Sequence, residues 1–117
     1  MKAMKLRPFI PSGTDYPRAV QFYIDLGFEK VYYSDELTIF KFEDIEFHLQ
    51  NYQNTELQHN YMVELCVQDL DAWWQHIQDS ELVNKYDIRV KPPQIQPYGK
   101  RAIHLIDTAG VLWHITE

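Results

Sequence analysis

Side chains that could bind a ligand recur along one side of several segments with a strand-like pattern. They include carboxylates, imidazoles, an amide and a thioether, and the set is Glu46, His48, Gln50, Met62, Glu64, Cys66, His114 and Thr116. Each of them alternates with an apolar residue along the chain. Successive side chains of a strand point to opposite faces, so each strand would have one apolar face and one ionisable face. Such an ionisable face suits the inside of a cleft better than an open surface.

The first strand, over residues 6–11, fits the same scheme. We place Phe9 on its apolar face and Pro8 and Ile10 on its cleft face. Cys66 is expected to be a small buried hydrophobic residue. His104 points to the side of its strand opposite Ile103 and Leu105. The sequence does not decide whether that side lines the cleft or lies on the surface.

A helix and three strands follow that first strand. Asp15 is a favourable helix N-cap, and Gly27 is a favourable residue to end the helix 16–26. Strands are expected over residues 28–34, 37–42 and 45–51, with short hairpin turns at 35–36 and 43–44. A polar segment, residues 52–60, is expected to be a linker.

The same order of elements then repeats. A strand is expected over residues 61–67, and Asp69 caps a helix whose apolar residues have helical spacing, namely Leu70, Trp73, Trp74 and Ile77. A polar stretch, 78–86, ends that helix, and strands follow at 88–91, 101–107 and 111–116. We therefore predict an α+β fold in one domain, 1–117, made of two βαβββ modules, 1–55 and 56–117. Their curved mixed sheets would form a concave cleft, with each other or with a partner chain.

The composition limits the kind of partner. The chain has 117 residues and a formal net charge of −6, which argues against nucleic acid and is compatible with a cationic ligand. One cysteine excludes an internal disulfide, so a reducing cytoplasm is the expected compartment. We find no apolar run long enough to cross a membrane and expect no signal peptide.

Several motifs resemble the vicinal oxygen chelate superfamily, which includes glyoxalases, dioxygenases and bleomycin resistance proteins. The segment Phe22-Tyr23 with Leu26-Gly27-Phe28 resembles its first helix, and Val67-Gln68-Asp69-Leu70-Asp71 resembles the opening of its second module. Asp107-Thr108-Ala109-Gly110, followed by Val111-Leu112-Trp113-His114, resembles its last hairpin. Within the superfamily, Gln96-Pro97-Tyr98-Gly99-Lys100-Arg101 is similar to a bleomycin-resistance segment that usually has Trp where Tyr98 stands.

The resemblance also bears on metal binding. Enzymes of the superfamily hold a divalent metal at positions that correspond to Pro8, Glu46, Met62 and His114. Only Glu46 and His114 are suitable ligands for a hard or borderline metal, and a catalytic site needs about three protein ligands. We therefore expect no metal cofactor. An alternative is a metal-dependent enzyme, a lyase or oxidoreductase, that uses Glu46, His48 and His114.

The resemblance implies a homodimer, often with exchanged N-terminal strands, that sequesters a cationic aromatic ligand such as bleomycin in a groove between subunits. Glu46 and Glu64 would neutralise positive groups, and Phe40 and Tyr98 would offer faces to flat rings. The remaining candidates are hydrogen-bonding or lining residues: His48, Gln50, Met62 and His114. Arg101 would brace the loop or a carboxylate. Binding of an unrelated small molecule remains a further alternative, and membrane partners are not expected.

Overall fold

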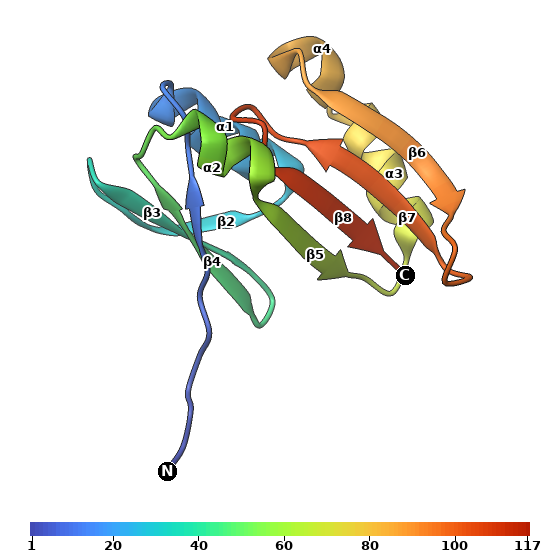
Figure 1. Cartoon of the computed structure of the whole chain (residues 1–117), viewed down its shortest axis with the longest axis horizontal. Coiled ribbons are helices and arrows are strands. Elements are labelled where there is room, and N and C mark those ends of the chain that lie inside the picture. Colours follow the sequence, from blue (N-terminus) through green and yellow to red (C-terminus); the bar gives the residue numbers. More distant parts are fainter.

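Two four-stranded sheets make up the framework of the protein, whose residues 1–117 are described by a computed structural model (Figure 1). The first sheet has the order β1-β4-β3-β2 and the second has the order β5-β8-β7-β6. The strands are β1 (Phe9–Pro11), β2 (Glu29–Tyr33), β3 (Leu37–Phe42), β4 (Ile45–Gln50), β5 (Met62–Cys66), β6 (Arg89–Ile95), β7 (Arg101–Ile106) and β8 (Leu112–Thr116). The helices are α1 (Tyr16–Leu26), α2 (Thr55–Asn60), α3 (Leu70–Asp79) and α4 (Leu82–Tyr86).

Both sheets are mixed and are built in the same way. In each sheet the strand before the long helix pairs in parallel with the last strand, β1 with β4 and β5 with β8. The remaining pairs are antiparallel. The predicted α+β class, with strand, helix and three strands occurring twice, is therefore confirmed.

The two long helices begin where the sequence predicts. The Asp15 carboxylate accepts a hydrogen bond from the Arg18 backbone N–H at 3.1 Å, and Asp69 accepts one from the Ala72 N–H at 3.0 Å. These bonds satisfy N–H groups that lack partners in the first turn of a helix. Gly27 follows α1 with a φ of +124°, a conformation that side chains rarely adopt.

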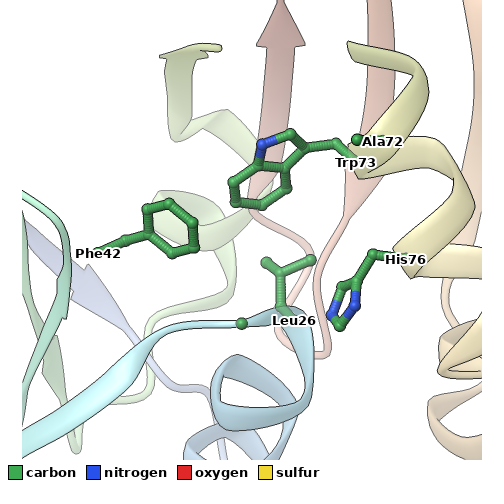
Figure 2. A pocket seen from close by; sticks show the side chains of 6 residues that line it. Leu26, Phe42, Ala72, Trp73 and His76 are labelled. Carbon is green, nitrogen blue, oxygen red and sulfur yellow. The ribbon is translucent and has the colours of Figure 1, made fainter. Parts of the chain in front are cut away.

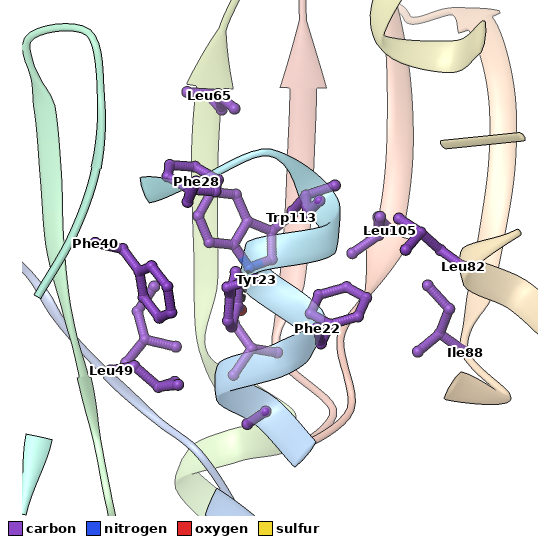
Figure 3. Close-up of a cluster of buried hydrophobic side chains, with 14 of the residues drawn as sticks. Phe22, Tyr23, Phe28, Phe40, Leu49, Leu65, Leu82, Ile88, Leu105 and Trp113 are labelled. Atoms are coloured by element: carbon purple, nitrogen blue, oxygen red, sulfur yellow. Dashed lines mark hydrogen bonds between the residues drawn. The ribbon is translucent and has the colours of Figure 1, made fainter. Parts of the chain in front are cut away.

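A single hydrophobic core joins the two modules (Figure 3). Tyr23 of α1 packs on Phe40 of the first sheet and on Trp113 of the second sheet, and Phe22 packs on Tyr23. The Trp113 Nε1–H donates to the Tyr23 hydroxyl at 2.9 Å, and that hydroxyl donates to Asp107. Because one helix packs on the inner faces of both sheets, the opposite faces of the sheets are left outside the core.

Two short helices replace segments expected to be irregular. Helix α2 lies in the predicted linker, and its buried Gln58 donates to the Ala109 carbonyl at 3.0 Å. Helix α4 lies in the predicted polar stretch, where Leu82 is buried in the core.

Strand β6 continues through Pro92 and Pro93, with a register shift between Lys91 and Gln94. Proline is tolerated there because β6 is an edge strand with a bulge.

The prediction for the first strand was wrong about which side chains are buried. Phe9 lies opposite His48 and is 50% exposed, whereas Ile10 lies opposite Leu49 and is fully buried. The strand has only three residues, and its apolar residues occur at both parities, so pairing with β4 decides the orientation. Cys66 is also exposed rather than buried.

Residues 1–8 have no regular secondary structure, and the chain runs away from the two sheets toward its N-terminus (Figure 1). Met1, Met4 and Leu6 in this segment are exposed. None of the helices has the length and apolar character that a membrane span requires.

Candidate ligand-binding surface

The outer face of the first sheet, defined as its side away from the core, carries Glu46, His48 and Gln50 of β4. Phe47 and Leu49, which alternate with them, are buried in the core. The predicted alternation along this strand is therefore confirmed. Phe9 of β1 and Ile39 of β3 flank His48 on the same face, because both lie opposite it in the strand register.

Glu46 is held by two basic residues of the N-terminal segment. The Lys5 Nζ lies 2.6 Å from Oε2, and the Arg7 Nη2 lies 3.0 Å from Oε1. The hydrogen bond from Lys5 lowers the pKa of the Glu46 carboxyl group most, burial partly opposes it, and the hydrogen bond and charge of Arg7 lower the pKa further. The carboxylate predicted to meet a cationic ligand is thus already paired within the chain.

His48 lies under an aromatic ring. Its ring stacks on Phe9 with centroids 4.3 Å apart and planes 6° apart. Burial lowers the pKa of His48, and the nearby positive charge of Arg7 lowers it further. The buried Nδ1 has no hydrogen-bond partner. The lowered pKa favours the neutral ring, and the covered Nδ1 is not directly accessible to a group that approaches this face.

The outer face of the second sheet carries a row of ionisable residues across four strands. Strand register aligns Lys91 of β6 with His104 of β7, His104 with His114 of β8, and His114 with Glu64 of β5. Glu64 is exposed, and its Oε2 accepts a hydrogen bond from Thr116 at 3.3 Å. Met62, two residues before Glu64, is 65% exposed. The row runs from a cation at one edge of the sheet to an anion at the other.

His104 and His114 touch each other in this row. Their ring centroids lie 4.8 Å apart and their planes are nearly perpendicular. Burial lowers the pKa of His104, followed by the charges of His114 and Lys91. The question that the sequence left open is therefore answered: His104 lies on the outer face, beside His114.

Three further predicted residues have different surroundings. Phe40 is fully buried, lies opposite Phe47 and packs on Tyr23, so the prediction that it offers a ring to a ligand on the outer face was wrong. Tyr98 is 61% exposed in the turn between β6 and β7. Arg101 pairs with both Asp71 and Glu117, with nitrogen–oxygen distances of 3.0 and 2.9 Å. It braces carboxylates, as the sequence predicts.

Glu46 and His48 lie on the first sheet, whereas Glu64 and His114 lie on the second sheet of the same chain. Glu46 and Glu64 both line a cavity of about 280 Å³ at the junction of the sheets, together with Pro8 and Trp113. Neither His48 nor His114 lines this cavity. No group of three or more His, Cys, Asp or Glu side chains lies close enough to hold a metal ion. The alternative metal ligands Glu46, His48 and His114 are thus not brought together within one chain.

A separate cavity of about 230 Å³ lies away from the outer faces, between the end of α1, β3 and α3 (Figure 2). Phe42 and Trp73 pack against each other in its wall, with ring centroids 5.1 Å apart. His76 closes one side and donates from Nε2 to the Asp25 carbonyl at 2.9 Å. No carboxylate lines this cavity.

Sequence reasoning missed two groups of residues on the outer faces. Lys5 and Arg7 precede the first strand, and nothing in the local pattern links them to Glu46, which is far along the chain. Arg89 and Lys91 alternate with Ile88 and Val90, and this alternation is a signal that could have placed both cations on one face.

The fold is shared with several solved structures. A bleomycin-binding protein from Streptomyces verticillus, complexed with copper(II)-bleomycin, is 24% identical with a TM-score of 0.82, and the match covers 99% of this chain and 97% of that one. The bleomycin resistance determinant of transposon Tn5 is 20% identical with a TM-score of 0.81 over 98% of both chains. A lactoylglutathione lyase from Agrobacterium tumefaciens is 18% identical with a TM-score of 0.71, over 99% and 95% of the two chains. No protein-family model and no curated protein sequence matches this chain.

These likenesses extend over nearly the whole chain. The predicted resemblance to bleomycin resistance proteins and to the glyoxalase/bleomycin resistance/dioxygenase superfamily is confirmed as a likeness of fold. Because the same fold occurs in binding proteins and in a lyase, the fold alone does not choose between these functions.

Proposed function

We propose that this protein is a resistance-like binding protein that sequesters a cationic aromatic small molecule, such as a bleomycin-type drug, without changing it. The ligand would lie in a groove between two copies of the chain, formed by the outer face of the first sheet of one copy and the outer face of the second sheet of the other. The single cysteine fits a reducing compartment such as the cytoplasm.

The observation that carries this proposal is the character of the two outer faces. They combine exposed apolar side chains, including Phe9, Tyr32 and Met62, with a carboxylate that has no basic partner, Glu64. Exposed apolar patches with polar groups at their margin are typical of binding surfaces. The solved structures with TM-scores above 0.8 include proteins that bind bleomycin.

Glu64 is our candidate for the group that meets a positive charge of the ligand. It is the exposed carboxylate of the ionisable row, and Glu46 is already paired with Lys5 and Arg7. Tyr98 supplies an exposed ring that can stack on a flat heterocycle and attract a cation. The other contacts that we propose are Met62 and the hydrogen-bonding groups His48, Gln50 and His114, while Arg101 holds the end of β7 in place.

A metal-dependent reaction at these residues is not our proposal. His48 is stacked on Phe9, and Glu46 is bound to two cations, so two of the three alternative ligands are engaged elsewhere. The third, His114, belongs to the other sheet and contacts His104. The residues of one chain therefore do not fit a divalent metal, and we derive no step through one.

Titration with metal-free bleomycin tests the proposal, followed by the fluorescence of the tryptophans and tyrosines. We expect saturable quenching with a Kd of roughly 10 μM or tighter. Glu64→Gln should weaken binding roughly tenfold, because one charge contact is lost from a partly desolvated site. Glu56→Gln, an exposed carboxylate on α2, is the matched control and should bind like the parent protein.

Absence of saturable quenching up to roughly 100 μM drug would remove the bleomycin assignment. A ligand of a different chemical class would then be sought for the same surface. Equal binding by Glu64→Gln and the parent protein would remove Glu64 from the site.

A further inference from the structure

Two cations on the outer face of the second sheet have no partner in the chain. Arg89 and Lys91 take part in none of the ion pairs, which involve Lys5, Arg7 and Arg101, and their side chains make no hydrogen bond. Several other basic residues of the chain are also outside the ion pairs, and Arg89 and Lys91 differ from them because both line one cavity that no carboxylate lines.

These cations border a cavity on the same face. The cavity has a volume of about 510 Å³ and is lined by Arg89, Val90, Lys91, His104, Ile106 and Leu112. Lys91 lies opposite His104 and Arg89 lies opposite Ile106 across the β6–β7 pair. Ile106 in turn lies opposite Leu112 on β8. The register therefore places basic groups along β6 and a polar ring at His104, beside an apolar floor made by Ile106 and Leu112.

We infer that this cavity binds a small organic anion, with a carboxylate, phosphate or phosphonate among Arg89, Lys91 and His104 and an apolar portion on Ile106 and Leu112. A guanidinium group donates two parallel hydrogen bonds to the oxygens of such an anion, and an ammonium group adds a mobile point charge. The His104 ring adds a third donor. No carboxylate lines the cavity to compete with a bound anion.

This site is distinct from the cation-binding role proposed for Glu64. Glu64 lies on β5, three strands away from Lys91 across the sheet, which corresponds to roughly 14 Å at the usual strand spacing. The anion site needs only the residues of β6, β7 and β8. None of the residues that line the anion cavity is among the proposed bleomycin contacts, so variants at Arg89 and Lys91 test anion binding and variants at Glu64 test bleomycin binding.

Phenylphosphonate is a suitable probe because it combines an anionic group with a small apolar ring. We would add it to the full ¹⁵N-labelled chain at constant ionic strength and follow the amide resonances by NMR. We expect saturable shifts centred on residues 89–91, 104–106 and 112, with a Kd of roughly 1 mM or tighter. Benzyl alcohol, which has a similar ring and no charge, should bind at least roughly tenfold more weakly.

Two variants test the role of the cations. Arg89→Gln and Lys91→Gln should each weaken phenylphosphonate binding roughly fivefold, and the double variant should weaken it further. Lys85→Gln, an exposed cation on α4, is the control and should bind like the parent chain. Because all three positions are exposed, the amide spectra of the variants should show that the fold is kept.

Shifts centred elsewhere, no saturation up to roughly 20 mM phenylphosphonate, or equal weakening by Lys85→Gln would each overturn the inference. So would equal affinity for benzyl alcohol and phenylphosphonate, because the basic residues would then contribute nothing.

Discussion

Asp107 connects the two modules through one buried side chain. Its Oδ1 accepts hydrogen bonds from the backbone N–H groups of Ala109, Gly110 and Val111, which fixes the turn between β7 and β8. Its Oδ2 accepts a hydrogen bond from the hydroxyl group of Tyr23 on α1. Burial raises the pKa of the Asp107 carboxyl group, while the bonds from Tyr23 and the turn partly oppose the rise. A helix of the first module is thereby attached to a turn of the second.

Tyr23→Phe should destabilise the protein by about 2 kcal/mol, because Asp107 loses a donor and the Trp113 Nε1–H loses its acceptor inside the core. Urea unfolding measures the change. Tyr32→Phe removes the hydroxyl of an exposed tyrosine and should change stability by less than about 0.5 kcal/mol. Equal stability of Tyr23→Phe and the parent protein would contradict the role of this hydrogen-bond chain.

Glu46 should make the stability of the folded protein depend on pH in the acidic range. Its pKa is lowered in the folded state, from an ordinary value of 4.5, by hydrogen bonds from Lys5 and Arg7. Its stabilising contribution is therefore complete above the unfolded pKa and is lost as the pH falls through the lower, folded pKa. We expect the parent protein to be more stable than Glu46→Gln at pH 7, with the difference shrinking below about pH 4.5. Urea unfolding of both proteins across this range would contradict the ion pairs if the difference were constant.

At the scale of elements, residues close together in the sequence were sufficient to predict the long helices and most of the hairpins. Asp15, Gly27 and Asp69 are capping residues whose effect depends on their immediate neighbours, so the bounds of α1 and the start of α3 were predictable. Helix α2 was not, because its buried residue Gln58 is polar and depends on the distant Ala109 carbonyl. Helix α4 is short, and packing of Leu82 in the core supports it.

The candidate surface could be predicted only where alternation was clear. In β4 the apolar and polar residues alternate strictly, so the orientation of Glu46 and His48 could be inferred. In β3, Ile39 and Phe40 are both apolar, and only the pairing of Phe40 with Phe47 assigns it to the core. Ion pairs such as Lys5–Glu46 join residues far apart in the chain and leave no local signal.

Removal of the N-cap of α1 tests how strongly this element depends on its own sequence. Asp15→Ala should destabilise the protein by about 1 kcal/mol, because the Arg18 N–H loses its acceptor. Asp44→Ala, in the exposed β3–β4 turn, is the control and should change stability by less than about 0.5 kcal/mol. Thermal or urea unfolding distinguishes them. A cap variant as stable as the control would mean that packing alone determines where α1 begins.

At the scale of the whole molecule, several of the exposed apolar residues lie in the N-terminal segment and on the first sheet. Met4 and Leu6 extend from the body, and Phe9 and Tyr32 lie on the outer face of the first sheet. Exposed apolar surface of this kind favours association with another chain. We propose that a second copy covers it.

The double variant Met4→Ser and Leu6→Ser should weaken self-association at least tenfold. Burial of one large apolar side chain contributes roughly 1.5–3 kcal/mol, and the variant removes two such side chains from the contact. Sedimentation velocity over a range of protein concentrations measures the dimerisation constant. Leu57→Ser, an exposed residue on α2, provides the matched control and should leave that constant unchanged. A parent protein that stays monomeric at every concentration would contradict the proposed dimer.

Complementation between two defective variants tests most directly whether the ligand site lies between two copies. Phe9→Ala with His48→Ala alters the outer face of the first sheet, and Glu64→Gln alters that of the second. A mixed dimer contains one copy of each variant. If each site lies between the two copies, one site combines the two altered faces and the other combines the two intact faces. Calorimetric titration with bleomycin should therefore give one site of parental affinity per mixed dimer, although both homodimers bind weakly. Mixed dimers that bind as weakly as the homodimers would contradict a site shared between chains.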